Sequence, residues 1–244
     1  MWKFLRKKSY SEIPFFTQMK KDMHSHLLPG IDDGSPDVET SIDFIHRLSD
    51  AGLKEFICTP HIFGDMFRNN EQTIHDALYR LRNAIHKEGL DVKISAAAEY
   101  MLDDYFMDLL RSGTQLLTLN GSYLLTEFPY SIPPFKLEEI TFEIHNLNYQ
   151  PILAHPERYA YFHRKPEMYS RMKDLGFLLQ INLLSLTGHY GKQVRNAAKY
   201  LVRQGLVDLV GTDLHHEGHL EMLLDPRSQK IFKDNFGDRI LNDF

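Results

Sequence analysis

Short apolar runs alternate with segments of helical periodicity along most of the chain. The apolar runs mostly lack a polar residue at every second position, which is typical of strands that are buried on both faces. We predict strands at seven of these runs, residues 21–24, 55–59, 92–98, 122–128, 151–155, 177–182 and 207–211.

Between the predicted strands, apolar residues recur at the three- and four-residue spacing of amphipathic helices. The segment 37–51 follows Ser35, which we predict as its N-cap, and stops before Gly52. The segment 71–88 stops in the same way before Gly89. Shorter helices are predicted at residues 103–111, 137–147, 166–175, 193–204 and 227–241.

Strand and helix alternate through seven cycles, and this order predicts parallel strands joined by right-handed crossovers. The predicted fold class is α/β, and seven strands with helices outside them favour a β/α barrel over an open sheet. A chain of 244 residues suits one such domain. We expect it to occupy residues 21–244, after an N-terminal extension of residues 1–20. The extension mixes basic and aromatic side chains, which suits packing on the domain or docking at a membrane surface or a partner.

The composition changes this picture in three respects. A formal net charge of −5 argues against nucleic-acid binding, because phosphate backbones require a basic face. No apolar stretch approaches the ~18 residues that span a bilayer, and no secretory signal pattern opens the chain. We therefore expect a cytoplasmic protein that is not integral to a membrane. The single cysteine, Cys58, lies in an apolar run and is predicted to be a buried core thiol.

Ionisable side chains follow six of the seven predicted strands. Because the carboxyl ends of the strands meet at one rim of a barrel, we expect these side chains to lie close together. Alternate residues of an extended segment point the same way, so His24 and His26 can reach one metal ion. Asp33 joins them from a turn-forming Asp-Asp-Gly stretch directly downstream. The other candidates at the strand ends are His61, Glu99, Glu127, His155, Asp213 and His215.

These nine side chains are the predicted metal ligands. Histidines and carboxylates against a buried rim are costly unless they are paired, and divalent cations remove that cost. Five histidines and four carboxylates are too many for one tetrahedral ion, so two or three ions are expected. Mixed nitrogen and oxygen ligands without thiolate suit manganese, iron or zinc, and suit magnesium less well. Closely spaced ions lower the pKa of bridging water, which indicates a metal-dependent hydrolase.

Arg158 follows His155 within the sequence His-Pro-Glu-Arg. A guanidinium beside a metal cluster is suited to bind phosphoryl oxygens and to stabilise their charge, which makes Arg158 the candidate catalytic and substrate-binding residue. The alternative is a salt bridge with Glu157 or another carboxylate. His216 and His219, just past the last pair of predicted ligands, are candidates for lining the pocket.

In combination these motifs resemble the polymerase-and-histidinol-phosphatase (PHP) superfamily, and more closely the bacterial manganese-dependent tyrosine phosphatases of capsular and exopolysaccharide operons. The resemblance implies a distorted seven-stranded, TIM-like β/α barrel with three divalent metal ions, with manganese expected and iron, zinc or magnesium as alternatives. It runs from about residue 22 to residue 219 and is carried by His24-Ser-His-Leu-Leu-Pro-Gly-Ile-Asp-Asp-Gly34, Thr59-Pro-His61, Glu99, Glu127, His155-Pro-Glu-Arg158 and Thr212-Asp-Leu-His215.

The resemblance also implies how ligands and substrate are held. Arg158 would grip the phosphate while a hydroxide activated by the metals attacks phosphorus without a phospho-enzyme intermediate. Relatives usually carry a further arginine after the last Asp-x-His pair, but residues 216–220 contain none. Either His219 partly substitutes as a substrate-binding residue, or phosphate binding rests more heavily on Arg158. The implied ligand sets are His24, His26, Glu99 and Asp213 for the first ion, the bridging Glu99 with Glu127 and His155 for the second, and Asp33, His61 and His215 for the third.

The expected substrate is a phosphotyrosine protein, namely the tail of a membrane tyrosine autokinase that controls polysaccharide export. A small-molecule phosphoesterase acting on histidinol phosphate or nucleotide phosphates, a hydrolase of amide bonds, and a non-catalytic binding module are the alternatives. The sequence leaves open which metal is native and whether the chain forms an oligomer. Aromatic residues near the rim could flank a phenyl ring or simply pack in the core and loops; they are Phe63, Phe67, Tyr130, Phe135, Tyr159 and Tyr161.

Overall fold

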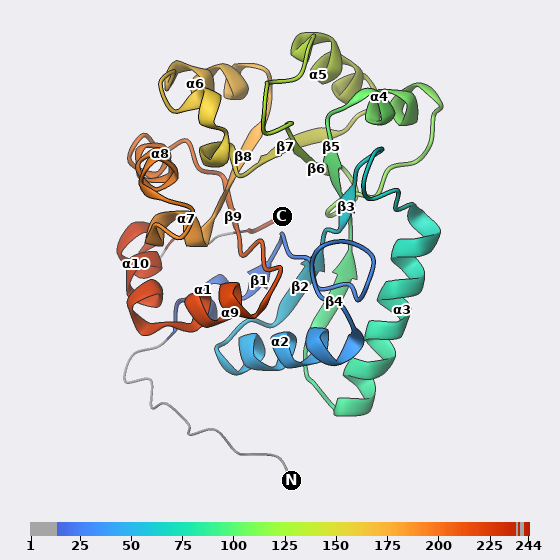
Figure 1. The fold of residues 1–244 in the computed structure, drawn as a ribbon, viewed down its shortest axis with the longest axis vertical. Coiled ribbons are helices and arrows are strands. Elements are labelled where there is room, and N and C mark those ends of the chain that lie inside the picture. Colours follow the sequence, from blue (N-terminus) through green and yellow to red (C-terminus); the bar gives the residue numbers. More distant parts are fainter. Residues whose placement is uncertain (1–13, 238, 240–241) are drawn as a thin grey trace.

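The computed structural model describes residues 14–237, 239 and 242–244, and its strands lie at the centre with helices around them (Figure 1). All paired strands run parallel, as predicted. One sheet has the order β1-β2-β4 and consists of β1 (Lys21–Asp22), β2 (Glu55–Cys58) and β4 (Lys93–Ala96). The other has the order β3-β5-β6-β7-β8-β9 and consists of β3 (His61–Ile62), β5 (Glu99–Met101), β6 (Tyr123–Glu127), β7 (Gln150–Ala154), β8 (Leu178–Asn182) and β9 (Leu209–Gly211).

Each predicted apolar run holds a strand, but the described part of the chain has nine strand segments in place of the seven predicted. The second predicted strand stops at Cys58 and resumes as β3 after Pro60, which has no N–H to donate to a ladder. The third stops at Ala96 and resumes as β5. After these breaks, His61 and Glu99 face each other in register across β3 and β5.

The segments that follow β1 and β9 lie side by side, although they are far apart in the sequence. Ser25 and Leu214 form an isolated parallel bridge. The N–H of His26 donates to the carbonyl of Leu214 at 3.0 Å, and the N–H of Asp213 donates to the carbonyl of His24 at 2.9 Å. The first and last strands are thus joined just beyond their carboxyl ends.

Helices form at every segment where the periodicity predicts one. The N-cap of α2 is Asp37, whose carboxylate accepts a hydrogen bond from the N–H of Thr40 at 2.8 Å, so the predicted Ser35 cap is wrong. Ser35 instead closes the preceding loop, because its N–H donates to the carbonyl of His26. The helices at predicted segments are α2 (Val38–Asp50), α3 (Glu71–Glu88), α4 (Asp104–Arg111), α5 (Leu137–Asn146), α6 (Glu167–Asp174), α8 (Lys192–Arg203) and α10 (Pro226–Phe236).

Five short helical elements are additions to the predicted set. The last predicted helix, in contrast, ends at Phe236 and not at residue 241, because Gly237 with its positive φ of 56° terminates it. Four of the additions have five residues or fewer and are too short to show a clear period in the sequence. They are α1 (Phe15–Met19), α7 (Leu183–Thr187), α9 (Glu217–Leu224) and the 3-10 turns η1 (Pro156–Arg158) and η2 (Ala160–Phe162).

Two hydrophobic clusters lie on opposite faces of the strands. In β6, Leu124 belongs to the large cluster that the helices share, and Leu125 belongs to a smaller one. In β7, Leu153 belongs to the large cluster and Ile152 to the smaller one. Because successive side chains of a strand point to opposite faces, the smaller cluster lies on the face turned away from the helices. β6 and β7 are therefore buried on both faces, as predicted, whereas β4 contains no buried residue.

The predicted N-terminal extension is described only from residue 14, since residues 1–13 lie outside the described part. In α1, the ring centroid of Phe15 lies 5.7 Å from that of Phe232 and 6.0 Å from that of Phe236, both in α10. Phe15 and Phe16 are buried, so this part of the chain belongs to the hydrophobic core. None of the described helices has the length and apolar character that a membrane span requires.

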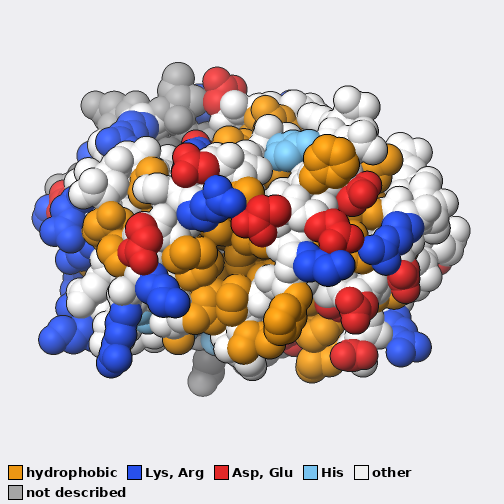
Figure 2. Space-filling model, turned by 90° about the horizontal axis from the view of Figure 1, so that it is seen from above, with side chains coloured by type: hydrophobic (Ala, Val, Ile, Leu, Met, Phe, Trp, Pro, Cys, Tyr) orange, Lys and Arg blue, Asp and Glu red, His pale blue; other side chains and the backbone are white. Residues whose placement is uncertain are grey.

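Hydrophobic side chains gather on the face above α4, α5 and α6, as Figure 2 shows. Phe142 in α5 is 66% exposed. Phe135 and Ile132, in the segment that leads into α5, are 83% and 54% exposed. Exposed apolar patches are typical of surfaces that contact another protein.

Candidate metal centre

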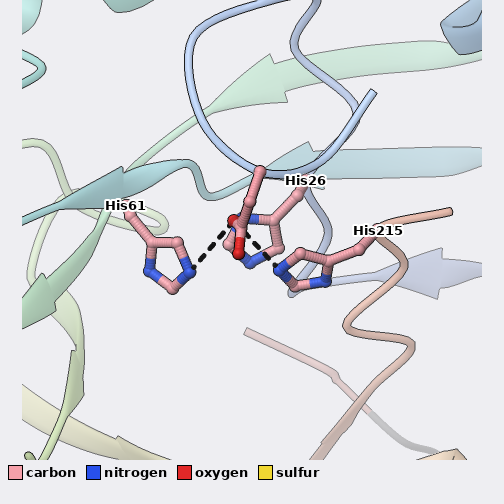
Figure 3. Close-up of side chains that lie close together, drawn as sticks. His26, His61 and His215 are labelled. Carbon is pink, nitrogen blue, oxygen red and sulfur yellow. Dashed lines mark ion pairs between the residues drawn. The ribbon is translucent and has the colours of Figure 1, made fainter. Parts of the chain in front are cut away.

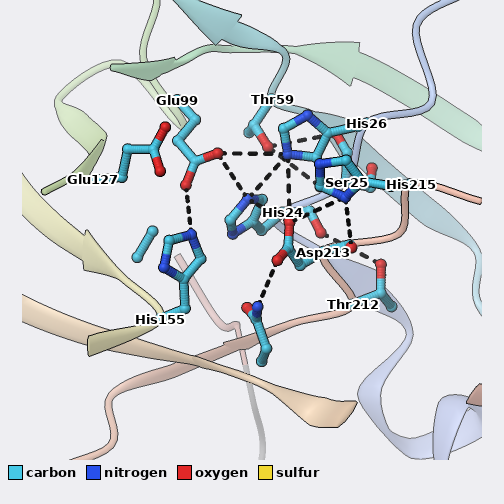
Figure 4. Close-up of polar contacts among 12 residues, drawn as sticks. His24, Ser25, His26, Thr59, Glu99, Glu127, His155, Thr212, Asp213 and His215 are labelled. Carbon is cyan, nitrogen blue, oxygen red and sulfur yellow. Dashed lines mark hydrogen bonds and ion pairs between the residues drawn. The ribbon is translucent and has the colours of Figure 1, made fainter. Parts of the chain in front are cut away.

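All nine predicted ligands come together in one cluster, beside the carboxyl ends of β1, β6, β7 and β9 and the first residues of β3 and β5 (Figure 3, Figure 4). The strand ladder places eight of them, and Asp33 reaches the cluster from the loop between β1 and α2. By element, His24 and His26 follow β1, His61 opens β3, Glu99 opens β5, Glu127 ends β6, His155 follows β7, and Asp213 and His215 follow β9.

The ligand atoms form four overlapping groups, within each of which they lie no more than 4.8 Å apart. His155 is grouped with His24 and Glu99, and Glu127 with His61 and Glu99. The ligand sets implied by the family resemblance place His155 and Glu127 together, so the grouping differs while the nine residues are the same. The other two groups are His24, His26 and Asp213, and His26, Asp33, His61 and His215.

Nitrogen and oxygen atoms converge at the centre of the cluster at distances that suit a shared cation. The Nε2 atom of His24 lies 3.3 Å from Glu99 Oε2 and 3.3 Å from Asp213 Oδ1. His26 Nε2 lies 3.5 Å from the same two oxygens. Toward the solvent side, Asp33 Oδ1 lies 3.6 Å from His61 Nε2 and 3.5 Å from the Nε2 of His215 (Figure 3).

Several of these atoms are buried without a hydrogen bond. Glu99 Oε2 and His61 Nδ1 are 3.2 Å apart, yet neither has a hydrogen-bond partner among the described residues. His155 Nδ1 is also unsatisfied. Unpaired buried polar atoms are costly, and a divalent cation bound by these lone pairs would remove the cost. The donor set therefore fits divalent ions of the kind that accept mixed imidazole and carboxylate ligands.

The electrostatics of the cluster also fit cations. Burial lowers the pKa of His24, but the negative charges of Glu99 and Asp213 outweigh this effect and raise it to about 9. For Asp213, burial raises the pKa, but His24, His215 and Arg158 bring it well below its usual range. The carboxylates thus attract positive charge into a buried place, either as protons on the histidines or as metal ions in their stead.

The backbone around the cluster shows two kinds of constraint. His155 and Asp213 have positive φ angles of 36° and 51°, a conformation that residues other than glycine rarely adopt. Such strain is typical of functional sites, where the surrounding structure holds the residue in place. Gly34 and Gly211 pack against the two histidines that follow β1. A Cβ atom at Gly34 would clash with His26, and one at Gly211 would lie 2.6 Å from His24 Cβ.

Two further side chains orient the first pair of histidines. His24 Nδ1 donates to Gln180 Oε1 at 2.8 Å, and His26 Nδ1 donates to Asp32 Oδ2 at 2.7 Å. These contacts fix each ring with its Nε2 atom toward the cluster, as partners of metal-bound histidines commonly do. The sequence reading missed both roles. The available signals were Asp32, the first aspartate of the Asp-Asp-Gly stretch, and the amides at alternate positions of β8, Gln180 and Asn182.

Removing the Asp32 side chain is expected to weaken metal binding. In Asp32→Ala the His26 ring loses the acceptor that orients it, so we expect Mn²⁺ affinity to fall by about 10- to 100-fold, the usual effect of losing such a partner. Calorimetric titration of the metal-free protein with Mn²⁺ measures the change. Asp76→Ala is the matched control, because it removes an exposed carboxylate of α3 that pairs with Gln72 and belongs to none of the ligand groups. Equal affinities of the two variants would contradict the role of Asp32.

Arg158 lies in the wall of a cavity above the cluster. Its Nη1 atom is 3.0 Å from Asp213 Oδ2, so the carboxylate that pairs with it is that of Asp213 and not of Glu157. Glu157 is buried and accepts hydrogen bonds from Asn182 N and Ser185 Oγ. The cavity has a volume of about 430 Å³ and is lined by Asp33, His61, Phe63, Met66, Phe67, Met101, Glu127, Tyr130, His155, Arg158, Tyr190, Asp213, His215, His216 and His219.

The aromatic candidates divide between the cavity and the core. Phe63, Phe67 and Tyr130 line the cavity. Tyr159 is buried in the core instead, where its hydroxyl donates to the carbonyl of Ala154. Phe135 and Tyr161 are absent from the cavity wall among the described residues.

His219 lines the cavity, as expected for a pocket residue, but it also has a structural contact. Its Nδ1 lies 3.2 Å from the carbonyl of Asp213, to which it can donate. Burial lowers the pKa of His219 to about 4, so the ring is neutral at neutral pH. It can offer a hydrogen bond in the cavity, but not the charge of an arginine.

Cys58 is buried, as predicted, and burial raises the pKa of its thiol to about 12. A thiol of this kind stays protonated at neutral pH and is a poor nucleophile. The chemistry of the cavity therefore depends on the cluster and Arg158, and not on a thiolate.

Comparison with known proteins places the chain among bacterial phosphatases. The family model described as "Capsular polysaccharide synthesis, CpsB/CapC" matches residues 20–241, a span that contains the whole cluster and Arg158. Tyrosine-protein phosphatase YwqE from Bacillus subtilis (strain 168) is 30% identical over 197 residues, which cover 80% of this chain and 77% of YwqE.

The solved structures agree with this comparison. A structure from work on YwqE from Bacillus subtilis and CpsB from Streptococcus pneumoniae, which are described as unique metal-dependent tyrosine phosphatases, matches with a TM-score of 0.79 and 27% identity over 89% of this chain and 87% of that chain. Histidinol phosphate phosphatase from Lactococcus lactis matches with a TM-score of 0.56 and 16% identity over 91% of this chain and 95% of that chain. The second likeness concerns the fold alone.

Proposed function

This chain belongs to the capsular polysaccharide synthesis family CpsB/CapC, and from that premise we propose that it is a metal-dependent protein-tyrosine phosphatase. The observation that carries the proposal is the position of Arg158 in a cavity whose floor is the histidine–carboxylate cluster. A guanidinium and a cation cluster on one cavity are suited to hold a phosphate monoester from two sides. The relatives named above support the choice of phosphotyrosine as substrate.

The nine clustered side chains are the proposed ligands of three divalent ions, and manganese is the proposed metal. Bound there, the ions supply charge for the phosphoryl oxygens and lower the pKa of the attacking water. The unsatisfied atoms of Glu99, His61 and His155 support this assignment. Among the alternatives, iron and zinc suit the imidazole-rich donor set better than magnesium does.

The protein's own groups bind and orient the substrate. Arg158 binds the phosphoryl oxygens, with Asp213 holding one end of its guanidinium. Phe63, Phe67 and Tyr130 form an aromatic part of the cavity wall that suits the phenyl ring of phosphotyrosine. A cavity with such a wall favours an aryl ester over the short aliphatic ester of phosphoserine, because the aryl ring buries apolar area that the serine side chain lacks.

The proposed biological partner is a membrane tyrosine autokinase that controls polysaccharide export, dephosphorylated by this chain in the cytoplasm. The family description, which concerns capsular polysaccharide synthesis, supports that setting. We also propose that residues 21–244 form one PHP-type domain whose strands close into a distorted barrel. The bridge between Ser25 and Leu214 supports closure, because it joins the first and last strands.

A small-molecule phosphoesterase of the histidinol phosphatase kind is the second candidate function. The likeness of fold to histidinol phosphate phosphatase favours it only at the level of architecture. A binding module without catalysis is disfavoured, because the nine donors and Arg158 are all in place.

A comparison of substrates tests the proposed function. The Mn-loaded full chain is expected to hydrolyse a phosphotyrosine peptide with a kcat/KM at least about 100-fold above that for the same peptide with phosphoserine, since the phenyl ring can bury apolar area that the serine side chain lacks. Histidinol phosphate is expected to be a poor substrate. If the chain hydrolyses histidinol phosphate efficiently and leaves the phosphotyrosine peptide intact, the result would favour a small-molecule phosphoesterase. No hydrolysis of any ester by protein with full metal content would favour a binding module.

A further inference from the structure

The guanidinium of Arg158 lies between two tyrosine rings. Its Cζ atom is 5.1 Å from the ring centroid of Tyr130 and 4.6 Å from that of Tyr190. Because the guanidinium is planar and stacks on aromatic faces, two rings limit the orientations that this long side chain can take. One nitrogen of the Arg158 guanidinium donates a hydrogen bond to Asp213, and no other described residue accepts a hydrogen bond from this side chain. The remaining donors stay available to a ligand in the cavity.

The two tyrosines reach the guanidinium from different parts of the fold. Tyr130 follows β6, and its ring also stacks on His155 with centroids 6.0 Å apart and planes at 17°. Tyr190 lies between α7 and α8, flanked by Gly188 and Gly191, which have φ angles of 93° and 95°. With these positive φ angles the two glycines adopt a backbone conformation that residues with a side chain rarely adopt. In this turn Tyr190 forms part of the cavity wall.

The hydroxyl of Tyr190 is buried and unsatisfied. It lies near the side chain of Asn182, yet it makes no hydrogen bond of ordinary geometry with any described residue. Burying a hydroxyl without a partner is costly, so a ligand that pairs with it gains affinity. Arg158 is the one arginine or lysine among the described residues of the cavity wall. A phosphoryl group has three terminal oxygens. After Arg158 has bound it, oxygens therefore remain that can accept a hydrogen bond from a further donor.

We propose that Tyr190 is a phosphate-binding residue, whose hydroxyl donates to a phosphoryl oxygen while its ring and that of Tyr130 hold the Arg158 guanidinium in its binding orientation. Tyr130 acts through Arg158 and is a positioning residue. This role rests on the proposed phosphatase function and adds a donor where the chain has no second arginine over residues 216–220. The ligand class is any phosphate monoester or free phosphate, because the contacts concern the phosphoryl group alone.

Binding of inorganic phosphate to the Mn-loaded full chain separates the two roles of Tyr190. Tyr190→Phe keeps the ring and loses the hydroxyl, and its Kd for phosphate is expected to rise about tenfold, as for the loss of one hydrogen bond to a charged group. Tyr190→Leu loses both and is expected to bind more weakly still. Tyr79→Phe is the matched control, because it removes the hydroxyl of an exposed tyrosine of α3, and it is expected to bind as the parent does. Tyr130→Leu is expected to bind phosphate less tightly. Calorimetry gives the Kd, and metal analysis verifies that manganese content is unchanged.

The arginine itself provides the second arm of the test. In an Arg158→Met background, Tyr130→Leu is expected to cause no further loss of phosphate affinity, because the ring then has no guanidinium to hold. With a phosphotyrosine peptide, Tyr190→Phe is expected to raise KM, and Tyr130→Leu to lower kcat through a misplaced guanidinium.

Unchanged phosphate affinity in Tyr190→Phe would overturn the proposal, and so would an equal loss in Tyr190→Phe and Tyr79→Phe. An effect of Tyr130→Leu that persists without Arg158 would show that the ring does not act through the guanidinium. The proposed function can fail while the role of Tyr190 holds. In that case the parent binds phosphate and the variants bind it as expected, but the parent hydrolyses no phosphotyrosine peptide.

Discussion

Replacing His24 and His26 together with alanine is expected to bring phosphatase turnover to background and to remove most of the bound manganese. The two rings present their Nε2 atoms to the same carboxylate oxygens of Glu99 and Asp213, within 3.5 Å. Removing them leaves two buried carboxylates facing each other with fewer ligands to hold a cation between them. The loss of turnover should exceed about 100-fold, the upper range for residues that only support a metal ligand.

Metal analysis and steady-state kinetics on the same preparation test this expectation. His46→Ala with His75→Ala is the matched control, since it also removes two histidines, from exposed positions in α2 and α3. The control is expected to keep full activity and manganese content. Turnover that survives in the His24 and His26 variant would show that the metal site has been assigned to the wrong residues. Circular dichroism establishes that both variants are folded.

Replacing Arg158 with methionine is expected to lower kcat/KM for a phosphotyrosine peptide by about 10²- to 10³-fold, the usual cost of one donor that stabilises charge in the transition state. Manganese content should stay the same, because Arg158 lies in the cavity wall and its side chain pairs with the cluster through Asp213, whereas its backbone bond to His155 is kept in the variant. Arg158→Lys is expected to recover only a small part of the activity. It restores a positive charge, but it lacks the planar pair of donors that fits two phosphoryl oxygens.

The matched control for this change is Arg171→Met, which removes a surface arginine paired with Glu138. Exposed pairs of this kind contribute little, so activity should be unaffected. If Arg158→Met loses activity because it loses manganese, the arginine supports the metal site and does not bind phosphate. If Arg158→Met keeps the parent's kcat/KM, another group in the cavity binds the phosphoryl oxygens.

Local patterns in the sequence were sufficient for the elements and for the ligand types. The helix over residues 71–88 and its stop at Gly89 follow from side-chain periodicity and from the left-handed conformation that glycine allows, and the structure has both. The strand ends could be located because buried strands are apolar and their ends here carry imidazoles and carboxylates. The position of His24, His26 and Asp213 on one edge follows from parallel order, since the carboxyl ends of parallel strands share that edge. Their contact also required the first and last strands to lie side by side.

The tertiary structure decided which groups touch. Gln180 orients His24 across 156 positions of sequence, and no local period connects two such residues. Tyr130 and Tyr190 come from separate loops and meet only at the guanidinium of Arg158. The spacing of apolar residues along the chain shows which face of a helix or strand is buried, but it does not identify the residues on the other side of the contact. The partner of a given polar atom depends on strand order, loop path and backbone φ angles, which are set by the packing of the whole chain.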